Sequence, residues 1–242
     1  MKLLKNVPGL TPSVRIIRRL LGLTPDVLSI RKQVGLSPRI IQTYFSDTKI
    51  HKLHIGCQDH PMDGWLNGDI YPKHTQVIYL DATNPFPFAD NQFSYVYSEH
   101  MIEHISFFDG QSMISECYRT MKPGGKIRIA TPNLHFLMKL YLQQEKEVHG
   151  KYLNFSNRYF LDKHPVMPGR VINNFFRDWG HQYIHDRESL EYLLMQAGFS
   201  NIVFPEVGSS EDAVLQNLEK HGEEITEEFN KLETIIIEAV KP

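Results

Sequence analysis

The chain has 242 residues, 41% of them hydrophobic and 22% charged, which suffices for the core of one α/β domain with an appendage. Its apolar runs fall far short of the roughly 20 residues that a membrane-spanning helix needs. Two cysteines, Cys57 and Cys117, are too few for a disulfide framework, and the N-terminus lacks the features of a signal peptide. The sequence therefore predicts a cytoplasmic protein.

The formal net charge of −2 hides an asymmetry between the two parts of the chain. Residues 1–45 carry eight basic side chains and one acidic one, a net of +7, so residues 46–242 must sum to −2 − 7 = −9. A basic arm of this kind either attracts phosphate or an anionic membrane surface, or is only the solvated face of short helices. The acidic body and the lack of a recognition module argue against a nucleic-acid partner.

The basic arm contains a repeat of Gly-Leu-Thr-Pro or Gly-Leu-Ser-Pro at 9–12, 22–25 and 35–38. In each unit, glycine can end one helix, the hydroxyl can cap the next, and proline fits its first turn. We therefore predict three short helices in an N-terminal extension over residues 1–48. Their apolar stripes need a partner, for which the chain's own core is the favoured candidate and a substrate or a lipid surface the alternative.

From residue 51 onward, predicted strands alternate with helices, which is typical of a largely parallel sheet. The expected strands lie at 52–56, 65–70, 76–81, 93–98, 126–130, 201–204 and 233–240, and the expected helices at 111–121 and 186–198. About ten residues separate the first two strands and fewer the next two, too few for full crossover helices. Residues 143–180 are expected to be an irregular substrate-side insertion in a domain over 49–242. Residues 206–228, with eight acidic side chains, are expected to form a solvated helical excursion.

Polar residues follow the first three expected strands where a nucleoside-binding sheet would place them. The first strand runs into Gly56-Cys57, and carboxylates end the next two at Asp69 and Asp81. The segment after the first strand contains no Gly-x-Gly-x-x-Gly to seat a pyrophosphate, which disfavours a dinucleotide.

Five ordered fragments resemble the motifs of class I S-adenosylmethionine-dependent methyltransferases. They are Leu53-His-Ile-Gly-Cys57, Gly64-Trp-Leu-Asn-Gly-Asp69, the stretch 81–93, Ser98-Glu-His-Met-Ile-Glu-His-Ile105 and Tyr118-Arg-Thr-Met-Lys-Pro-Gly-Gly-Lys-Ile-Arg-Ile129. They are most similar to a small branch of the type 11 group that has Gly-Trp-x-Asn-x-Asp in its second strand. The resemblance covers residues 51 to about 204 and implies a three-layer Rossmann-like fold. Its sheet would be mostly parallel with an antiparallel last strand, its early crossover helices abbreviated.

The resemblance implies S-adenosylmethionine as cofactor and S-adenosylhomocysteine as product. Gly56 would allow close approach of the backbone, Asp69 would accept the ribose hydroxyls, and Asp81 and Ala82 would hold the adenine. The complete set that it implies around the cofactor is His54, Gly56, Cys57, Gln58, Asp69, Ile70, Asp81, Ala82, Ser98, Glu99 and His100. Gln58 stands where the family has a second glycine, which supports the alternative of a non-catalytic binding or regulatory protein.

His100-Met-Ile-Glu103-His104 also spells the H-x-x-E-H pattern of some zinc proteases. The pattern here follows a strand, where the resembling family carries Glu-His, so zinc proteolysis is disfavoured and no metal is expected. Glu103 and His104 are instead expected to line or border the cleft.

The acceptor is expected to be a small molecule or a glycan-type compound, methylated at oxygen. A hydroxyl acceptor must lose its proton, for which His100, His135 and His181 are the candidate bases. The predicted insertion supplies candidate substrate contacts at Tyr152, Arg158, Tyr159, Arg170 and Arg177. The basic arm would suit a lipid-linked or phosphorylated substrate at a membrane face, and the protein would act as a monomer or homodimer.

Overall fold

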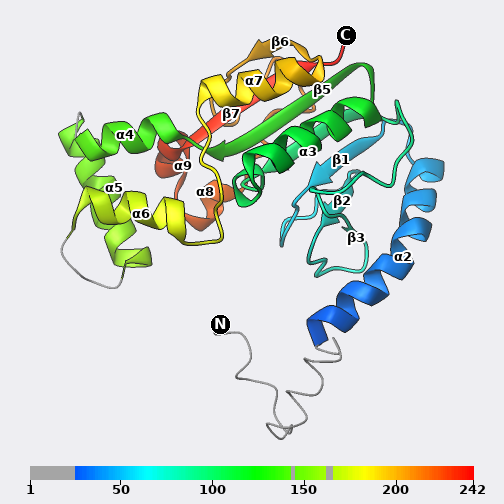
Figure 1. The fold of residues 1–242 in the computed structure, drawn as a ribbon, viewed down its shortest axis with the longest axis horizontal. Coiled ribbons are helices and arrows are strands. Elements are labelled where there is room, and N and C mark those ends of the chain that lie inside the picture. The colour runs from blue at the N-terminus through cyan, green and yellow to red at the C-terminus, as the bar shows by residue number, and fades with distance from the viewer. Residues whose placement is uncertain (1–24, 143–144, 162–165) are drawn as a thin grey trace, which may run out of the picture.

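The computed structural model describes residues 25–142, 145–161 and 166–242, with side chains from residue 33 onward (Figure 1). Within these residues a seven-stranded sheet has the order β3-β2-β1-β4-β5-β7-β6. The strands are β1 (Lys52–Ile55), β2 (Leu66–Asp69), β3 (Ile78–Tyr79), β4 (Phe93–Glu99), β5 (Met121–Pro132), β6 (Ser200–Val203) and β7 (Thr234–Val240). β7 pairs antiparallel with both β5 and β6, whereas the pairs formed by β1 to β5 are parallel. The predicted mostly parallel sheet with an antiparallel last strand is confirmed.

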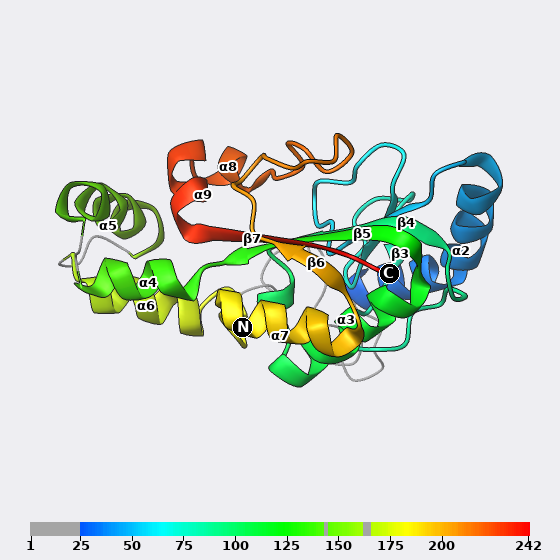
Figure 2. The same ribbon diagram turned by 90° about the horizontal axis from the view of Figure 1, so that it is seen from above.

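Helices cover the sheet unevenly. They are α2 (Pro25–Asp47), α3 (Phe107–Thr120), α4 (Leu134–Leu142), α5 (Lys146–Phe160), α6 (Pro168–Arg177), α7 (Arg187–Ala197), α8 (His221–Glu224) and α9 (Glu227–Glu233), with a 3-10 turn η1 at Ile102–His104. Figure 2 shows α3 and α7 against one face of the sheet, and α8, α9 and the segment before them above the other. No described helix is long and apolar enough to cross a membrane.

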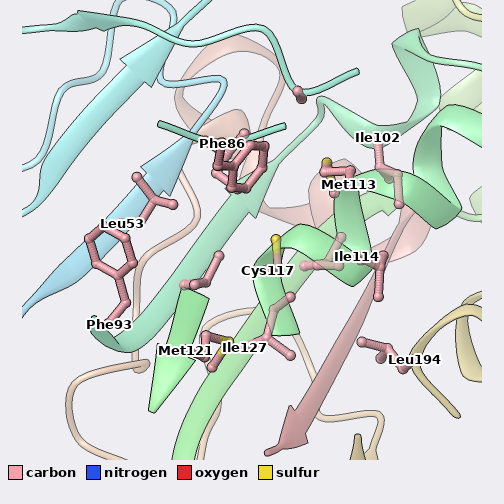
Figure 3. Packing of buried hydrophobic residues seen from close by; sticks show 14 of the residues in the cluster. Leu53, Phe86, Phe93, Ile102, Met113, Ile114, Cys117, Met121, Ile127 and Leu194 are labelled. Carbon is pink, nitrogen blue, oxygen red and sulfur yellow. The ribbon is translucent and has the colours of Figure 1, made fainter. Parts of the chain in front are cut away.

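The main core lies between the sheet and the helices α3 and α7 (Figure 3). Strand side chains such as Leu53 and Phe93 meet Met113 and Cys117 of α3, and all four are fully buried. Leu194 of α7 completes this layer. Burial of these apolar surfaces is the principal stabilising contribution, and it fixes the carboxyl ends of β1 and β4 side by side.

The predicted loss of the early crossover helices is confirmed, because β1, β2 and β3 follow one another without an intervening helix. The second face of the sheet is covered instead by residues 204–220, which contain no helix. Leu215 of this segment is fully buried against Trp65 and Tyr97. The prediction of a solvated helical excursion was therefore wrong for this segment, since its apolar and charged side chains pack on the sheet.

α2 departs from the three short helices predicted from the repeat. The first unit lies outside the described residues, but α2 runs without interruption through the third unit, including Pro38. Ile40, Ile41, Tyr44 and Phe45 pack against the main core. This tertiary packing outweighs the local preference for a helix end. The division of the chain at residue 48 stays a prediction.

The segment 143–180 was predicted to be irregular, and this was also wrong. α5 and α6 occupy most of its described residues and pack with α4 around a second apolar core. Tyr152 and Phe175 are buried in that core, where Tyr152 meets Phe229 of α9 edge to face. Apolar residues at helical spacing in an aromatic, basic segment form a helical lobe beside the sheet, at the left of Figure 1.

Candidate active site

A cavity of about 440 Å³ lies where the order of the strands changes direction, between β1 and β4. In open α/β sheets this switch point, outside the carboxyl ends of the strands, is where ligands bind. The sheet contributes the loop after β1 and the end of β4, and the helical lobe contributes Tyr152, Phe160, Phe175 and Trp179. The remaining lining residues are mostly histidines and glutamates: His54, His60, Glu99, His100, Glu103, His104, His181, His221, Glu224 and Glu233.

The loop after β1 has two residues with positive φ. Gly56 has a φ of +73° and lines the cavity, and a Cβ built on it would lie 2.4 Å from Cγ of Met101, so no side chain fits at this position without a shift. Gln58 has a φ of +44° and is exposed at the cavity. Its amide donates to Asp69 Oδ2 at 2.8 Å, which closes the loop onto β2. Burial and the charge of Asp69 raise the pKa of Cys57 to about 12, so its thiol stays protonated.

Asp69 and Asp81 already accept hydrogen bonds from neighbouring groups of the chain and do not line the cavity. Asp69 Oδ1 accepts from the amide of Tyr71 at 2.7 Å, and Asp81 accepts from Thr83 and Asn84. Each carboxylate oxygen has more than one lone pair and can accept a further hydrogen bond.

The structure divides the eleven residues implied around the cofactor. His54, Gly56, Cys57, Gln58, Glu99 and His100 line the cavity. The others lie outside it: Asp69, Ile70, Asp81, Ala82 and Ser98. Among them the Ser98 hydroxyl is buried without a hydrogen-bond partner, directly before the cavity residue Glu99.

A histidine and glutamate cluster connects β4 to α8 and α9. His100 Nδ1 lies 3.2 Å from Glu103 Oε1, and the His100 ring lies against that of His221, with centroids 3.9 Å apart and the planes tilted by 35°. His221 Nε2 in turn contacts Glu233 at 2.9 Å. The carboxylate of Glu99 accepts from the amides of residues 220 and 221, which holds α8 against the end of β4.

Burial and charge set the protonation of these groups. Burial lowers the pKa of His54 to about 4, so this ring is neutral at pH 7. Burial opposes ionisation of Glu103, but His100 and His104 outweigh it and lower its pKa to about 2. Burial likewise lowers the pKa of His181. For His100, burial favours the neutral ring, yet the neighbouring carboxylates raise its pKa overall.

Only some of the predicted acceptor-side residues reach the cavity. His100, His181 and Tyr152 line it, whereas His135 is exposed on α4 and does not. Three predicted substrate contacts are exposed and lie outside the cavity: Arg158, Tyr159 and Arg177. Arg170 also lies outside it, and its guanidinium donates to the backbone carbonyl of Leu161.

The expectation that Glu103 and His104 line or border the cleft is confirmed. His221 and Glu233, by contrast, received no role from the sequence. Neither stands in a recognisable motif, and both reach the cavity only because α8 and α9 fold back over the sheet.

Comparison with known proteins gives the class. Residues 59–129 match the family model described as a methyltransferase domain. This segment runs from the loop after β1 into β5 and includes the carboxyl end of β4, one of the two strands at the switch point. This match to a methyltransferase domain agrees with the resemblance found in the sequence. Membership of the branch with Gly-Trp-x-Asn-x-Asp stays a prediction.

Individual similar proteins are more distant. A demethylmenaquinone methyltransferase of Staphylococcus saprophyticus is 29% identical over 133 residues, which are 52% of this chain and 50% of that protein. The chain thus matches about half the length of this curated relative. An S-adenosylmethionine-dependent methyltransferase from Archaeoglobus fulgidus has a TM-score of 0.47 at 18% identity, covering 93% of this chain and 98% of the other. A possible histamine N-methyltransferase from Thermotoga maritima has a TM-score of 0.46 at 16% identity, covering 94% and 98%.

Proposed function

We propose that the protein binds S-adenosylmethionine in this cavity and transfers its methyl group to an oxygen of a small-molecule or glycan-type acceptor. The observation that carries the proposal is the position of the cavity. It opens at the switch point between β1 and β4, and the segment that matches the methyltransferase family contributes the end of β4 and the turn after it. Its volume, about 440 Å³, lies in the range of small-molecule sites.

The chain's own residues fit such a cofactor. S-adenosylmethionine supplies a methyl group on a positively charged sulfonium. Glu99 and Glu103 place two carboxylates at the cavity, where low dielectric strengthens their attraction for a cation. Asp69 and Asp81 are proposed to accept hydrogen bonds from ribose and adenine with their remaining lone pairs.

The acceptor side is proposed to be the wall formed by the helical lobe. Tyr152, Phe160, Phe175 and Trp179 present aromatic surface to the cavity, which suits a flat ring or a sugar. We assign proton removal to His100, because it lines the cavity and is oriented by contacts with Glu103 and His221. Most of the basic arm lies outside the described residues, so contact with a membrane or a lipid-linked acceptor stays a prediction.

Calorimetric titration with S-adenosylmethionine tests the cofactor site. We expect binding by the wild-type protein and loss of binding in Asp69→Ala and Asp81→Ala. Glu191→Gln, an exposed carboxylate of α7, serves as control and should bind as the wild type does. A folded wild-type protein that binds neither S-adenosylmethionine nor S-adenosylhomocysteine would refute the proposal.

Transfer of a labelled methyl group to a panel of phenols and sugars tests the reaction itself. With an active acceptor, His100→Asn should lower kcat by about 10²-fold to 10⁴-fold, the usual contribution of a general base. The alternative, a non-catalytic binding protein, is favoured by the position of Gln58 at the cavity. It predicts cofactor binding without transfer to any acceptor, in the wild type and in Gln58→Gly alike.

A further inference from the structure

Three metal-binding side chains converge on one wall of the cavity. Glu103, His104 and His181 each offer one donor atom, and these atoms all lie within 4.8 Å of one another. Glu103 and His104 belong to the turn η1 after β4, whereas His181 follows α6 in the helical lobe. The set is therefore assembled by the fold from two parts of the chain.

Backbone hydrogen bonds hold these two parts together. The amides of Gln182 and Tyr183 donate to the carbonyl of Glu103 at 2.7 and 3.2 Å. The side-chain amide of Gln182 donates to the carbonyl of His104 at 2.8 Å. The rings of His104 and His181 meet edge to face, with centroids 4.8 Å apart. The three donors are consequently positioned by contacts that do not use their own ligating atoms.

The carboxylate of Glu103 is an independent indication that a ligand belongs here. Its side chain is 0% exposed, and Oε2 accepts from the hydroxyl of Thr131 at 3.0 Å. Oε1 lies 3.2 Å from His100 Nδ1 but accepts no hydrogen bond. Because the contact with His100 lacks hydrogen-bond geometry, this buried carboxylate oxygen keeps lone pairs that can bind a cation.

The second ring nitrogen of His181 is arranged as in metal-binding histidines. Nδ1 lies 2.7 Å from the carbonyl of Phe175, which accepts its hydrogen. The ring is thereby held in the tautomer whose Nε2 carries a free lone pair. Metal-ligating histidines commonly donate their other N–H to a carbonyl in this way, which fixes both tautomer and orientation.

We propose that Glu103, His104 and His181 bind a divalent first-row transition ion, with an open coordination position facing the cavity. Two imidazoles and one carboxylate favour an ion such as Zn²⁺ over Mg²⁺ or Ca²⁺, which prefer oxygen ligands. Three protein ligands with one open position are typical of catalytic rather than structural zinc. Tetrahedral ligation at about 2.1 Å requires donors roughly 3.4 Å apart, so the three side chains would draw together on binding.

The proposed site uses two of the three residues of the H-x-x-E-H pattern. His104 and Glu103 are ligands, but the second imidazole comes from His181, while His100 approaches Glu103 from its other side. The ion would lie on the cavity wall beside His100. There it could bind an acceptor hydroxyl and lower the pKa of that hydroxyl. His181 would then be a ligand and not a base, in agreement with the assignment of proton removal to His100.

The site is tested on the full-length protein after chelation and removal of bound metal. Zn²⁺ titration against a chromogenic chelator should give about one ion per chain. His104→Gln, His181→Gln and Glu103→Gln should each weaken binding at least about 10-fold, since even residues that only support ligands contribute 10-fold to 100-fold. His60→Gln removes another cavity histidine and should bind Zn²⁺ as the wild type does.

Two further readouts keep folding defects apart from loss of ligands. Zn²⁺ should raise the melting temperature of the wild type and of His60→Gln but not of the three ligand variants. Co²⁺ should give the visible absorption of a low-coordinate nitrogen and oxygen site in the wild type, and lose it in His181→Gln. Stoichiometric Zn²⁺ binding that survives in all three variants, or no Zn²⁺ or Co²⁺ binding by the folded wild type, would overturn the proposal. Neither readout involves S-adenosylmethionine, so failure of the proposed function leaves this test intact.

Discussion

Gly56 directly follows β1 in a conformation that any side chain would strain. Its φ is +73°, and an added Cβ would meet Met101 Cγ at 2.4 Å and Met101 Cβ at 2.7 Å. A left-handed conformation costs a non-glycine residue about 1–2 kcal/mol, and overpacking adds about 1–3 kcal/mol. We therefore expect Gly56→Ala to lower the free energy of unfolding by about 2–5 kcal/mol, measured by urea denaturation.

Gly64 provides a matched control for this substitution. It has the same φ of +73°, but the nearest atom to an added Cβ is the amino group of Lys52, at 3.7 Å. Gly64→Ala should therefore lose only the conformational contribution of about 1–2 kcal/mol. Equal losses in the two variants would show that Met101 can move away, and that Gly56 is required for its backbone conformation alone.

Single residues of the site were predictable where they end a strand. Gly56 directly follows β1, Glu99 is the last residue of β4 and His100 directly follows it, and strand ends gather at one edge of a parallel sheet. His221 was not predictable, because its place at the cavity depends on hydrogen bonds from α8 to Glu99. His181 was predicted as a candidate base from its position in the sequence, but its proximity to Glu103 and His104 could be seen only in the structure.

Two polar side chains of helix α2 form hydrogen bonds with backbone groups in and beside the edge strand β3. The Ser37 hydroxyl donates to the carbonyl of Gln33 at 2.7 Å and accepts from the amide of Tyr79 at 2.9 Å. Gln33 donates to the carbonyls of Thr75 and Val77 beside the strand. These contacts satisfy backbone groups at a sheet edge that would otherwise be exposed or unpaired.

Ser37→Ala should destabilise the protein by about 1–3 kcal/mol, since it removes the acceptor for a partly buried amide. Ser46→Ala is the control, because the Ser46 hydroxyl near the end of the same helix makes only exposed hydrogen bonds. We expect the control to change stability by less than about 0.5 kcal/mol. Thermal unfolding of both variants measures the difference. Similar melting temperatures would mean that water replaces Ser37 at the strand.

The boundaries of elements were predictable where local chemistry decides them. α7 begins after Asp186, whose side chain forms a capping box with Ser189, and ends at Gly198 with a φ of +102°, as its sequence predicts. The same kind of local evidence failed in α2, where Gly35 and Pro38 lie inside the helix. There the contacts with β3 and the main core, which local sequence does not encode, decide the outcome.

Across the whole molecule, the two faces of the sheet are covered by unlike elements. One face carries α3 and α7, and the other carries the non-helical segment 204–220 that leads into α8. Arg128 of β5 anchors this segment through Glu219 and also contacts Glu238 of β7. Lys220, the residue after Glu219, donates its backbone N–H to the carboxylate of Glu99 at the cavity. The segment that covers this face of the sheet therefore continues directly into the part of the chain that forms one wall of the cavity.

Arg128→Met tests how strongly this anchor holds. Arg128 is fully buried and its guanidinium lies between two buried or nearly buried carboxylates. Removing it leaves both carboxylates without their counter-ion, which typically costs about 3–5 kcal/mol. We expect a loss of this size in urea denaturation, together with weaker binding of S-adenosylmethionine, because Glu99 loses the support of the segment that holds it.

Lys126→Met separates this effect from the general loss of an ion pair. Lys126 lies on the same strand and contacts Asp212 of the same covering segment at 2.8 Å, but its side chain is 36% exposed. Solvent screening limits such a pair to less than about 1 kcal/mol, so this variant should remain close to wild type in stability and binding. If both variants lost equal stability, attachment of the covering segment to the sheet would depend on the number of ion pairs and not on the buried contact of Arg128. A large loss confined to Arg128→Met would instead locate the anchor in the buried contact, and a parallel loss of cofactor affinity would connect that anchor to the site.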